Sequence, residues 1–214
     1  MTEAEWVACC EPTALLIFEE HRSAERKLRL FACACVYRVW SSLGDERCRQ
    51  AVALGECLAD GRVNEEERKV ALQAVEAALR AADPPICSPA EHAIVAARYT
   101  LVESALIGFA AAYRAASCLG AGKTNEQARQ AVLFRDIFGN RFRPVSFDPA
   151  WRTDTAVSLA RQMYDSREFG AMPILADALQ DAGCEDERVL HHCRDASQVH
   201  VRGCWVCDLV LGKE

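Results

Sequence analysis

The sequence has few aromatic residues and no long apolar segment. Aromatic side chains make up only 7% of its 214 residues. The most apolar stretch, residues 99–113, contains Glu103 and is shorter than the roughly 20 residues that a bilayer-spanning helix needs. The opening MTEAEW has neither the basic nor the apolar region of a secretory signal peptide. We therefore expect no membrane span and a cytoplasmic location.

The chain also lacks an excess of positive charge. It carries 25 Lys and Arg against 31 Asp and Glu, a formal net charge of −6. Binding to nucleic acid or to an anionic membrane usually needs a concentrated cationic surface. This balance therefore argues against both as partners.

Cysteine, in contrast, is abundant, with twelve residues. Without an export signal, and in a chain long enough to bury a large core, reduced thiols are the better interpretation. Free cysteine behaves as a small hydrophobic residue and is usually buried. We predict that most of the twelve are reduced and buried, with no disulfide network.

Helix signals recur along the whole chain, and no run alternates long enough to predict a sheet. Caps or prolines predict where several helices begin: Pro12, Asp45, Asn64 with Glu67, Ser88 with Pro89, Thr124 with Gln127, Thr153 and Pro173. The expected helices include 23–43, 45–60, 64–82, 88–120, 124–138, one that begins at Thr153, 173–183 and 185–194, and the apolar segment 204–211 is expected to dock on the body of the protein. The predicted class is mostly α, a compact orthogonal or bundle-like globule of about eight to ten helices without a substantial β-sheet. We expect one helical unit over 1–214, with a possible weak subdivision into 1–121 and 122–214.

Arginine and lysine side chains recur on the predicted helix 23–43. They are Arg22, Arg26, Lys27, Arg29 and Arg38. An amphipathic helix places such residues on its solvated face. We therefore expect these side chains to be exposed, and the alternative is that they contact an acidic partner.

Soft metal ligands are concentrated near the C-terminus. Zinc in proteins takes four tetrahedral ligands, mostly Cys and His, and structural sites often place one pair two residues apart, as in Cys204-Trp205-Val206-Cys207. No second CxxC is present, so the remaining ligands must come from scattered residues. The candidate ligands are Cys184, His192, Cys193, His200, Cys204 and Cys207. The alternatives are plain core packing and a redox pair, and the latter lacks its usual βαβ context.

Aromatic and cationic residues are interleaved over residues 134–152. Arginine with aromatic side chains suits a protein interface or a nucleic-acid strand. The candidate interaction residues are Arg135, Arg141, Phe142, Arg143 and Trp151. The alternative is that the aromatic side chains anchor an ordered loop onto the core.

Motifs of known enzymes are incomplete or missing. The sequence contains neither G-x-S-x-G nor H-E-x-x-H, and Gly120-Ala121-Gly122-Lys123-Thr124 lacks the first glycine and preceding strand of a phosphate-binding loop. A nucleophilic cysteine paired with a histidine distant in sequence remains open. The leading interpretation is a non-enzymatic helical protein-interaction or regulatory module without a cofactor. Its alternatives are a small zinc-binding protein and an enzyme that uses a Cys–His pair.

Several strings resemble an uncharacterised, highly paralogous bacterial family. They are MTEAEWVACCEPT, RKLRLFACAC, FRDIFGNRFRPVSFDPAW, PILADALQDAGC and HVRGCWVCDLVLGKE. The resemblance covers residues 1–40 and 134–214 and brings no known activity, substrate or catalytic residue. It implies a bacterial intracellular setting and two ends that pack together around a variable helical middle. It also implies that relatives lack a cysteine at the position of Cys207, so a zinc site would then draw on Cys184 or His192.

Overall fold

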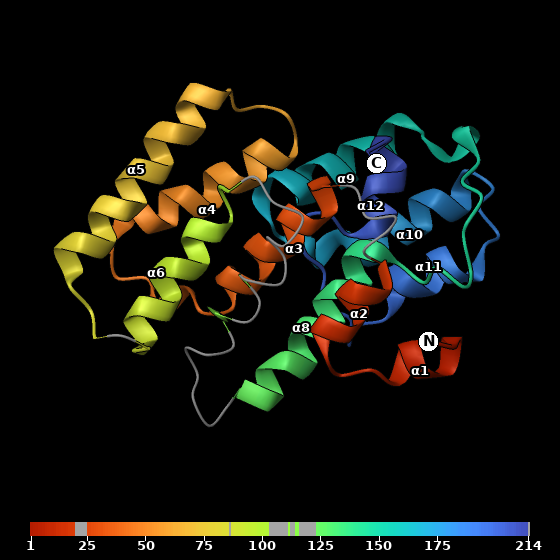
Figure 1. The fold of residues 1–214 in the computed structure, drawn as a ribbon. Coiled ribbons are helices and arrows are strands. Elements are labelled where there is room, and N and C mark those ends of the chain that lie inside the picture. The colour runs from red at the N-terminus through yellow and green to blue at the C-terminus, as the bar shows by residue number, and fades with distance from the viewer. Residues whose placement is uncertain (20–24, 86, 103–110, 112–113, 116–122, 214) are drawn as a thin grey trace. The chain divides into compact units, whose positions relative to one another are not determined.

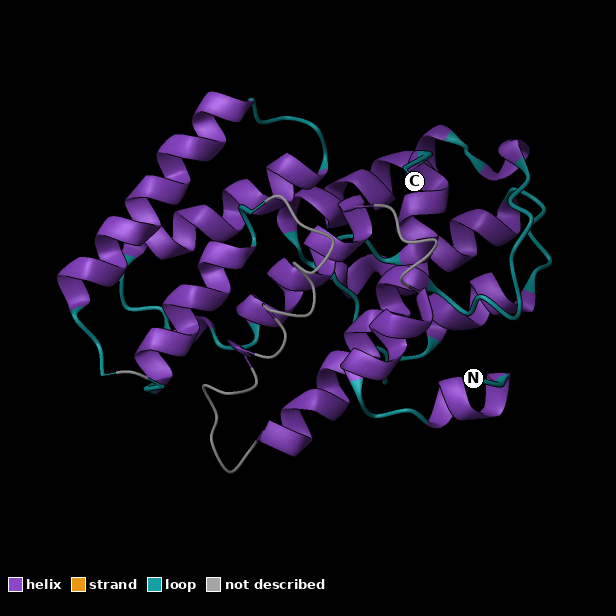
Figure 2. Ribbon diagram, in the orientation of Figure 1, coloured by secondary structure: helices purple, strands orange, loops and turns teal. Residues whose placement is uncertain are grey.

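The protein is described by a computed structural model that covers residues 1–19, 25–85, 87–102, 111, 114–115 and 123–213. These residues form eleven α-helices and, as Figures 1 and 2 show, no strand. The predicted mostly α class is confirmed. In chain order the helices are α1 (Glu3–Ala8), α2 (Pro12–Glu19), α3 (Glu25–Tyr37), α4 (Glu46–Ala59), α5 (Glu65–Ala82), α6 (Pro89–Tyr99), α8 (Lys123–Phe138), α9 (Asp154–Ser166), α10 (Met172–Asp181), α11 (Glu187–Arg194) and α12 (Trp205–Leu211).

Backbone contacts divide the chain into two compact units, Met1–Phe134 and Arg135–Glu214. The boundary falls inside α8, later than the predicted subdivision after residue 121, and the Gly120–Gly122 turn lies outside the described residues. The organisation as a single unit stays a prediction. None of the helices in the described ranges has the length and apolar character needed to cross a bilayer.

The first unit is built on α3, α4, α5 and α6. Helix α4 contacts each of the other three. All residues from Leu28 to Val36 in α3 are buried, so this helix has no solvated face along its middle. Within the same unit, Phe31 meets Phe134 edge to face, with ring centroids 5.6 Å apart. Arg38 donates to both carboxylate oxygens of Glu126, at 2.5 and 3.0 Å.

One of the arginines expected on the solvated face of helix 23–43 is buried. Arg29 exposes only 2% of its surface, because its guanidinium donates to the carbonyls of Thr100 and Val102. The expectation of an exposed side chain is therefore wrong for this residue. Arg22 lies outside the described residues.

Two predicted helices are shorter in the structure. The helix expected to reach Leu43 ends at Tyr37, and a 3-10 turn follows at Trp40–Ser42. Helix α6, expected to continue to Gly120, ends at Tyr99. Much of the rest of that predicted helix lies outside the described residues.

The second unit packs α9, α10, α11 and α12 around its own apolar core. Helix α10 contacts α9 and α11, and α9 also contacts α12. The core includes Met163, Leu175, Val189 and Val210, and the partly buried Phe147 and Trp151 pack against it. Phe147 and Trp151 thus anchor the loop between α8 and α9, in agreement with the second interpretation of segment 134–152, whereas Phe142 of the same loop is exposed.

All eleven cysteines that the structure describes are free thiols. Seven of them are buried: Cys33, Cys35, Cys48, Cys184, Cys193, Cys204 and Cys207. Cys118 lies outside the described residues. For the described cysteines, the prediction that most thiols are buried is confirmed, and the reduced state stays a prediction.

Candidate metal site

Four potential metal ligands come from three helices and one loop of the second unit. Asp136 lies in the last turn of α8, and His192 lies in the last turn of α11. His200 lies in the loop before α12, and Cys204 is the N-cap residue of α12. The ligand atoms of these four side chains all lie within 4.8 Å of one another.

The local sequence explains why these side chains converge. In α11, Val189 and Cys193 face the apolar core of the unit. His192, the residue before Cys193, therefore lies next to that core. Gly139 ends α8 with φ of +67°, a conformation that glycine adopts without strain. A Cβ at this position would lie 3.3 Å from Cγ of Trp205, so glycine also lets the start of α12 pack closely against the end of α8.

Four of the six distances between the ligand atoms are 2.9–3.8 Å, and none exceeds 4.8 Å. Asp136 Oδ1 lies 2.9 Å from His200 Nδ1 and 3.3 Å from His192 Nε2. Cys204 Sγ lies 3.2 Å from His192 Nε2 and 3.8 Å from His200 Nδ1. Tetrahedral zinc with ligands at 2.0–2.3 Å holds neighbouring ligand atoms about 3.3–3.8 Å apart. The cluster is therefore close to the size that zinc requires.

Further hydrogen bonds orient the ligands from outside the cluster. The backbone N–H of Val201 donates to Asp136 Oδ2 at 2.9 Å, which holds the carboxylate with Oδ1 toward the histidines. The indole N–H of Trp205 donates to His192 Nδ1 at 3.2 Å. The contact from Val201 is of the kind that fixes the orientation of metal ligands. The contact from Trp205 requires an unprotonated Nδ1 on His192, because the indole N–H can only donate.

Burial and neighbouring charges shift the pKa values of all four groups. Burial raises the pKa of Asp136, but hydrogen bonds from His192 and His200 outweigh it, and the net pKa is lowered. Burial lowers the pKa of both histidines, whereas Asp136 and Cys204 raise them to about 9 for His192 and about 10 for His200. Burial, together with Cys207 and Asp136, raises the pKa of the Cys204 thiol well above its ordinary value.

The arrangement differs from that of a catalytic cysteine triad. In such a triad the histidine meets the nucleophile with one nitrogen and the orienting carboxylate with the other. Here Cys204 and Asp136 both face His192 Nε2, while Nδ1 faces Trp205. Cys204 is also fully buried, so a substrate has no direct access to its sulfur. The geometry suits a closed ligand set better than nucleophilic catalysis.

The structure brings together three of the six ligands proposed from the sequence, namely His192, His200 and Cys204. The other three, Cys184, Cys193 and Cys207, are buried in the apolar core of the unit. Sequence reasoning missed Asp136, which is 64 residues from His200 in the chain. The available signal was an acidic residue in the apolar run from Val132 to Phe138.

The candidate interaction residues lie in varied environments. Phe142 is 38% exposed and Arg143 is exposed, whereas Arg135, Arg141 and Trp151 are partly buried. Arg188 donates to the carbonyl of Pro144 at 3.0 Å, and Arg152 donates to the carbonyl of Leu209. The segment is therefore held to the rest of its unit at both ends, with Phe142 and Arg143 left at the surface.

Comparisons of the chain with family models, curated proteins and solved structures find no match. The functional argument therefore rests on the site itself.

Proposed function

We propose that the second unit is a zinc-binding domain in which Asp136, His192, His200 and Cys204 hold the ion. The observation that carries this proposal is the convergence of four ligand atoms within 4.8 Å. One thiolate, two imidazoles and one carboxylate form a mixed set of the kind that zinc accepts. The ion would also supply the positive charge that a buried carboxylate and a thiolate need.

A structural role fits this donor set better than a catalytic one. Structural zinc sites use four protein ligands, whereas catalytic sites keep one position for water or substrate. Asp136 and Cys204 are fully buried, and the side chains of His192 and His200 are 10% and 6% exposed. Zinc would tie the end of α8 to α11 and α12 within the second unit.

Zinc binding would change the environment of Trp205. An ion on His192 Nε2 requires the ring proton on Nδ1, and the indole N–H of Trp205 can only donate. The hydrogen bond of 3.2 Å between these two groups would therefore be lost. We expect the fluorescence of the protein to change on zinc addition, and we expect a Trp205→Phe variant to bind zinc without that change.

Metal analysis of protein purified without a histidine tag tests the proposal. We expect about one zinc per chain. Cys204→Ser should lower the zinc content and weaken affinity about tenfold or more, because a thiolate ligand is lost. Cys184→Ala and Cys193→Ala are matched controls that each remove a buried thiol outside the ligand set, and they should retain zinc.

Two results would overturn the proposed site. A zinc content far below one per chain that added zinc does not raise would exclude the ion. Equal zinc loss from Cys204→Ser and from both control variants would show that the ligand set is misassigned.

A second candidate function is protein interaction through the loop between α8 and α9. It is supported by Phe142, an exposed aromatic residue, next to the exposed Arg143 on a loop held at both ends. Exposed apolar and arginine side chains together are typical of interface centres. Oligomeric state and partner identity stay open under this proposal.

Affinity capture from the native host tests the interaction. A Phe142→Ser/Arg143→Glu variant should lose a partner that the unmodified protein retains, whereas Arg161→Glu, which reverses another exposed charge, should keep it. Retention of every partner by the double variant would remove this candidate.

Membership in the bacterial family likewise remains a proposal, supported by the resemblance of the quoted strings.

A further inference from the structure

The first unit contains a cavity of about 270 Å³ between the ends of three helices. Its lining combines the start of α3, the end of α4 and the start of α5. The lining includes the charged residues Glu25, Arg29, Glu65 and Arg68 and the apolar residues Leu58 and Val63. The volume is near the lower limit of small-molecule sites, about 300 Å³.

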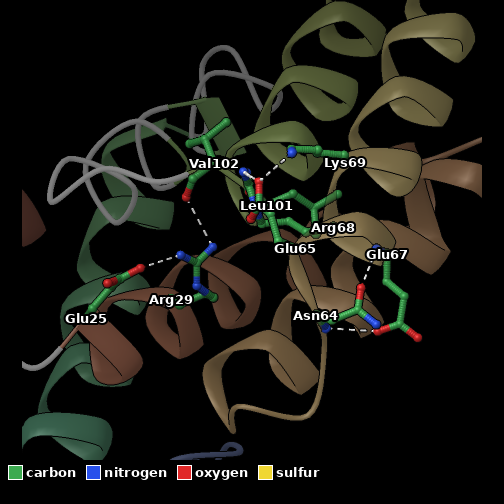
Figure 3. Close-up of polar contacts among 9 residues, drawn as sticks. All are labelled: Glu25, Arg29, Asn64, Glu65, Glu67, Arg68, Lys69, Leu101 and Val102. Atoms are coloured by element: carbon green, nitrogen blue, oxygen red, sulfur yellow. Dashed lines mark hydrogen bonds and ion pairs between the residues drawn. The ribbon is translucent and has the colours of Figure 1, made fainter.

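Two buried arginines are held in this wall by backbone carbonyls. Nη1 of Arg29 donates to the carbonyls of Thr100 and Val102, at 2.7 and 3.2 Å. Nη1 of Arg68 donates to the carbonyl of Leu101 at 2.9 Å. Figure 3 shows both guanidinium groups reaching this one segment after α6 from two different helices. Their positions are thus fixed by groups that do not line the cavity.

Other nitrogen atoms of each guanidinium bind the carboxylate of a glutamate. Nη2 of Arg29 lies 2.7 Å from a carboxylate oxygen of Glu25, and Nε and Nη2 of Arg68 form a fork with Glu65 at 2.7 and 2.6 Å (Figure 3). The arginine side chains are only 3% and 11% exposed, whereas the glutamate side chains are 65% and 49% exposed.

Because the arginines are buried and the glutamates are exposed, another carboxylate can replace the two glutamates as the partners of the arginines. A buried guanidinium needs a counter-charge, because an unpaired buried cation is strongly destabilising. The glutamates are exposed and each pairs with a residue one helical turn away. Each can therefore rotate into solvent without backbone movement once another carboxylate supplies the counter-charge. Any other carboxylate that enters the cavity can take their place.

We propose that the cavity binds a small aliphatic dicarboxylate, whose two carboxylates replace those of Glu25 and Glu65 on Arg29 and Arg68. Planar carboxylates match the fork that Arg68 already presents to Glu65. The methylene groups between the two carboxylates would contact Leu58 and Val63. Arg26, also in the wall, pairs with Asp60 at 3.3 Å, and the two carboxylates of the ligand would face Arg29 and Arg68.

Calorimetric titration of the full chain with succinate, glutarate, acetate and inorganic phosphate tests this site. We expect one of the two dicarboxylates to bind and acetate to bind about tenfold or more weakly, because it can satisfy only one guanidinium. A Glu25→Gln/Glu65→Gln variant should bind that dicarboxylate more tightly, by up to about fivefold for each competing carboxylate removed.

Glu66→Gln is the matched control, because Glu66 is an exposed residue in the same turn of α5 and does not line the cavity. It should leave the affinity nearly unchanged. Arg68→Lys keeps the charge but loses the fork, so it should weaken binding, with circular dichroism confirming that the variant is folded. Three results would overturn the proposal: no dicarboxylate binding by either the unmodified chain or the double glutamine variant, equal affinity for acetate, or tighter binding of phosphate.

Discussion

Gly55 lies inside α4, where glycine normally weakens a helix. A Cβ there would lie 2.9 Å from the Cβ of Thr100 and 3.1 Å from Sγ of Cys33, both of which are buried. Alanine favours a helix over glycine by about 0.5–1 kcal/mol, but overpacking a core costs about 1–3 kcal/mol. We therefore expect Gly55→Ala to lower the free energy of unfolding by about 1–2 kcal/mol.

Urea denaturation followed by circular dichroism measures this change. Gly44 is a suitable control, because no atom lies within 4 Å of a Cβ built there. Gly44→Ala should be neutral or stabilising by up to about 1 kcal/mol. If Gly55→Ala and Gly44→Ala had the same free energy of unfolding, close packing would not explain why glycine occupies position 55.

At the scale of the element, α11 depends on its N-cap. A side-chain oxygen of Asp186 accepts the backbone N–H of Arg188 at 2.9 Å, and the Arg188 side chain, which also donates to this carboxylate, is the main cause of the lowered pKa of Asp186. Because the folded pKa is depressed, this stabilisation is present above the unfolded pKa and is lost as the pH falls through the folded pKa. Asp186→Ala should cost about 1 kcal/mol at neutral pH, and this cost should shrink below pH about 3.9.

Asparagine separates the two contributions of Asp186. Asp186→Asn keeps a good cap but loses the charge, so its stability at neutral pH should be close to that of the unmodified protein, without the additional acid dependence. Glu185→Gln, which removes an exposed charge one residue earlier, serves as the control. Thermal unfolding across the acidic range would show the difference, and an Asp186→Ala penalty that does not vary with pH would contradict the argument.

Capping chemistry also explains which helices could be predicted from the sequence. Asn64 with Glu67 forms the expected capping box of α5, and Thr153 caps α9 as predicted. The end of α6 could not be predicted in this way. The carbonyls of Thr100 and Leu101, directly after the helix, accept hydrogen bonds from Arg29 and Arg68 of other helices, and contacts over such separations leave no local pattern.

At the scale of the whole molecule, the cysteines give a direct test of burial. Cys10 and Cys87 are exposed, and seven of the other described cysteines are buried. Titration of the native protein should therefore detect a few fast thiols, Cys10 and Cys87 among them. Denaturation without reductant should release all twelve that the sequence contains. Recovery of clearly fewer thiols would mean that disulfides had formed.

The candidate site was predicted only in part, because one of its four ligands is distant in the sequence from the other three. His192, His200 and Cys204 lie close together in the sequence, so their spacing alone suggested a metal site. Asp136 precedes them by more than fifty residues and joins them only because α8 ends beside α12 within the second unit. Cys193 and Cys207 have similar spacing, but their side chains turn into the apolar core.

The two arginines that reach the segment after α6 also bear on how fast the first unit folds and unfolds. Arg29 and Thr100 are 71 residues apart in the chain, and Arg68 and Leu101 are 33 apart. Helices α4 and α5 are neighbours in sequence and can pair first, whereas closing these longer loops costs more chain entropy. We therefore expect the arginine contacts to form late in folding. Interactions that are absent from the transition state slow unfolding and hardly affect the folding rate, so these contacts should mainly lower the unfolding rate of the first unit.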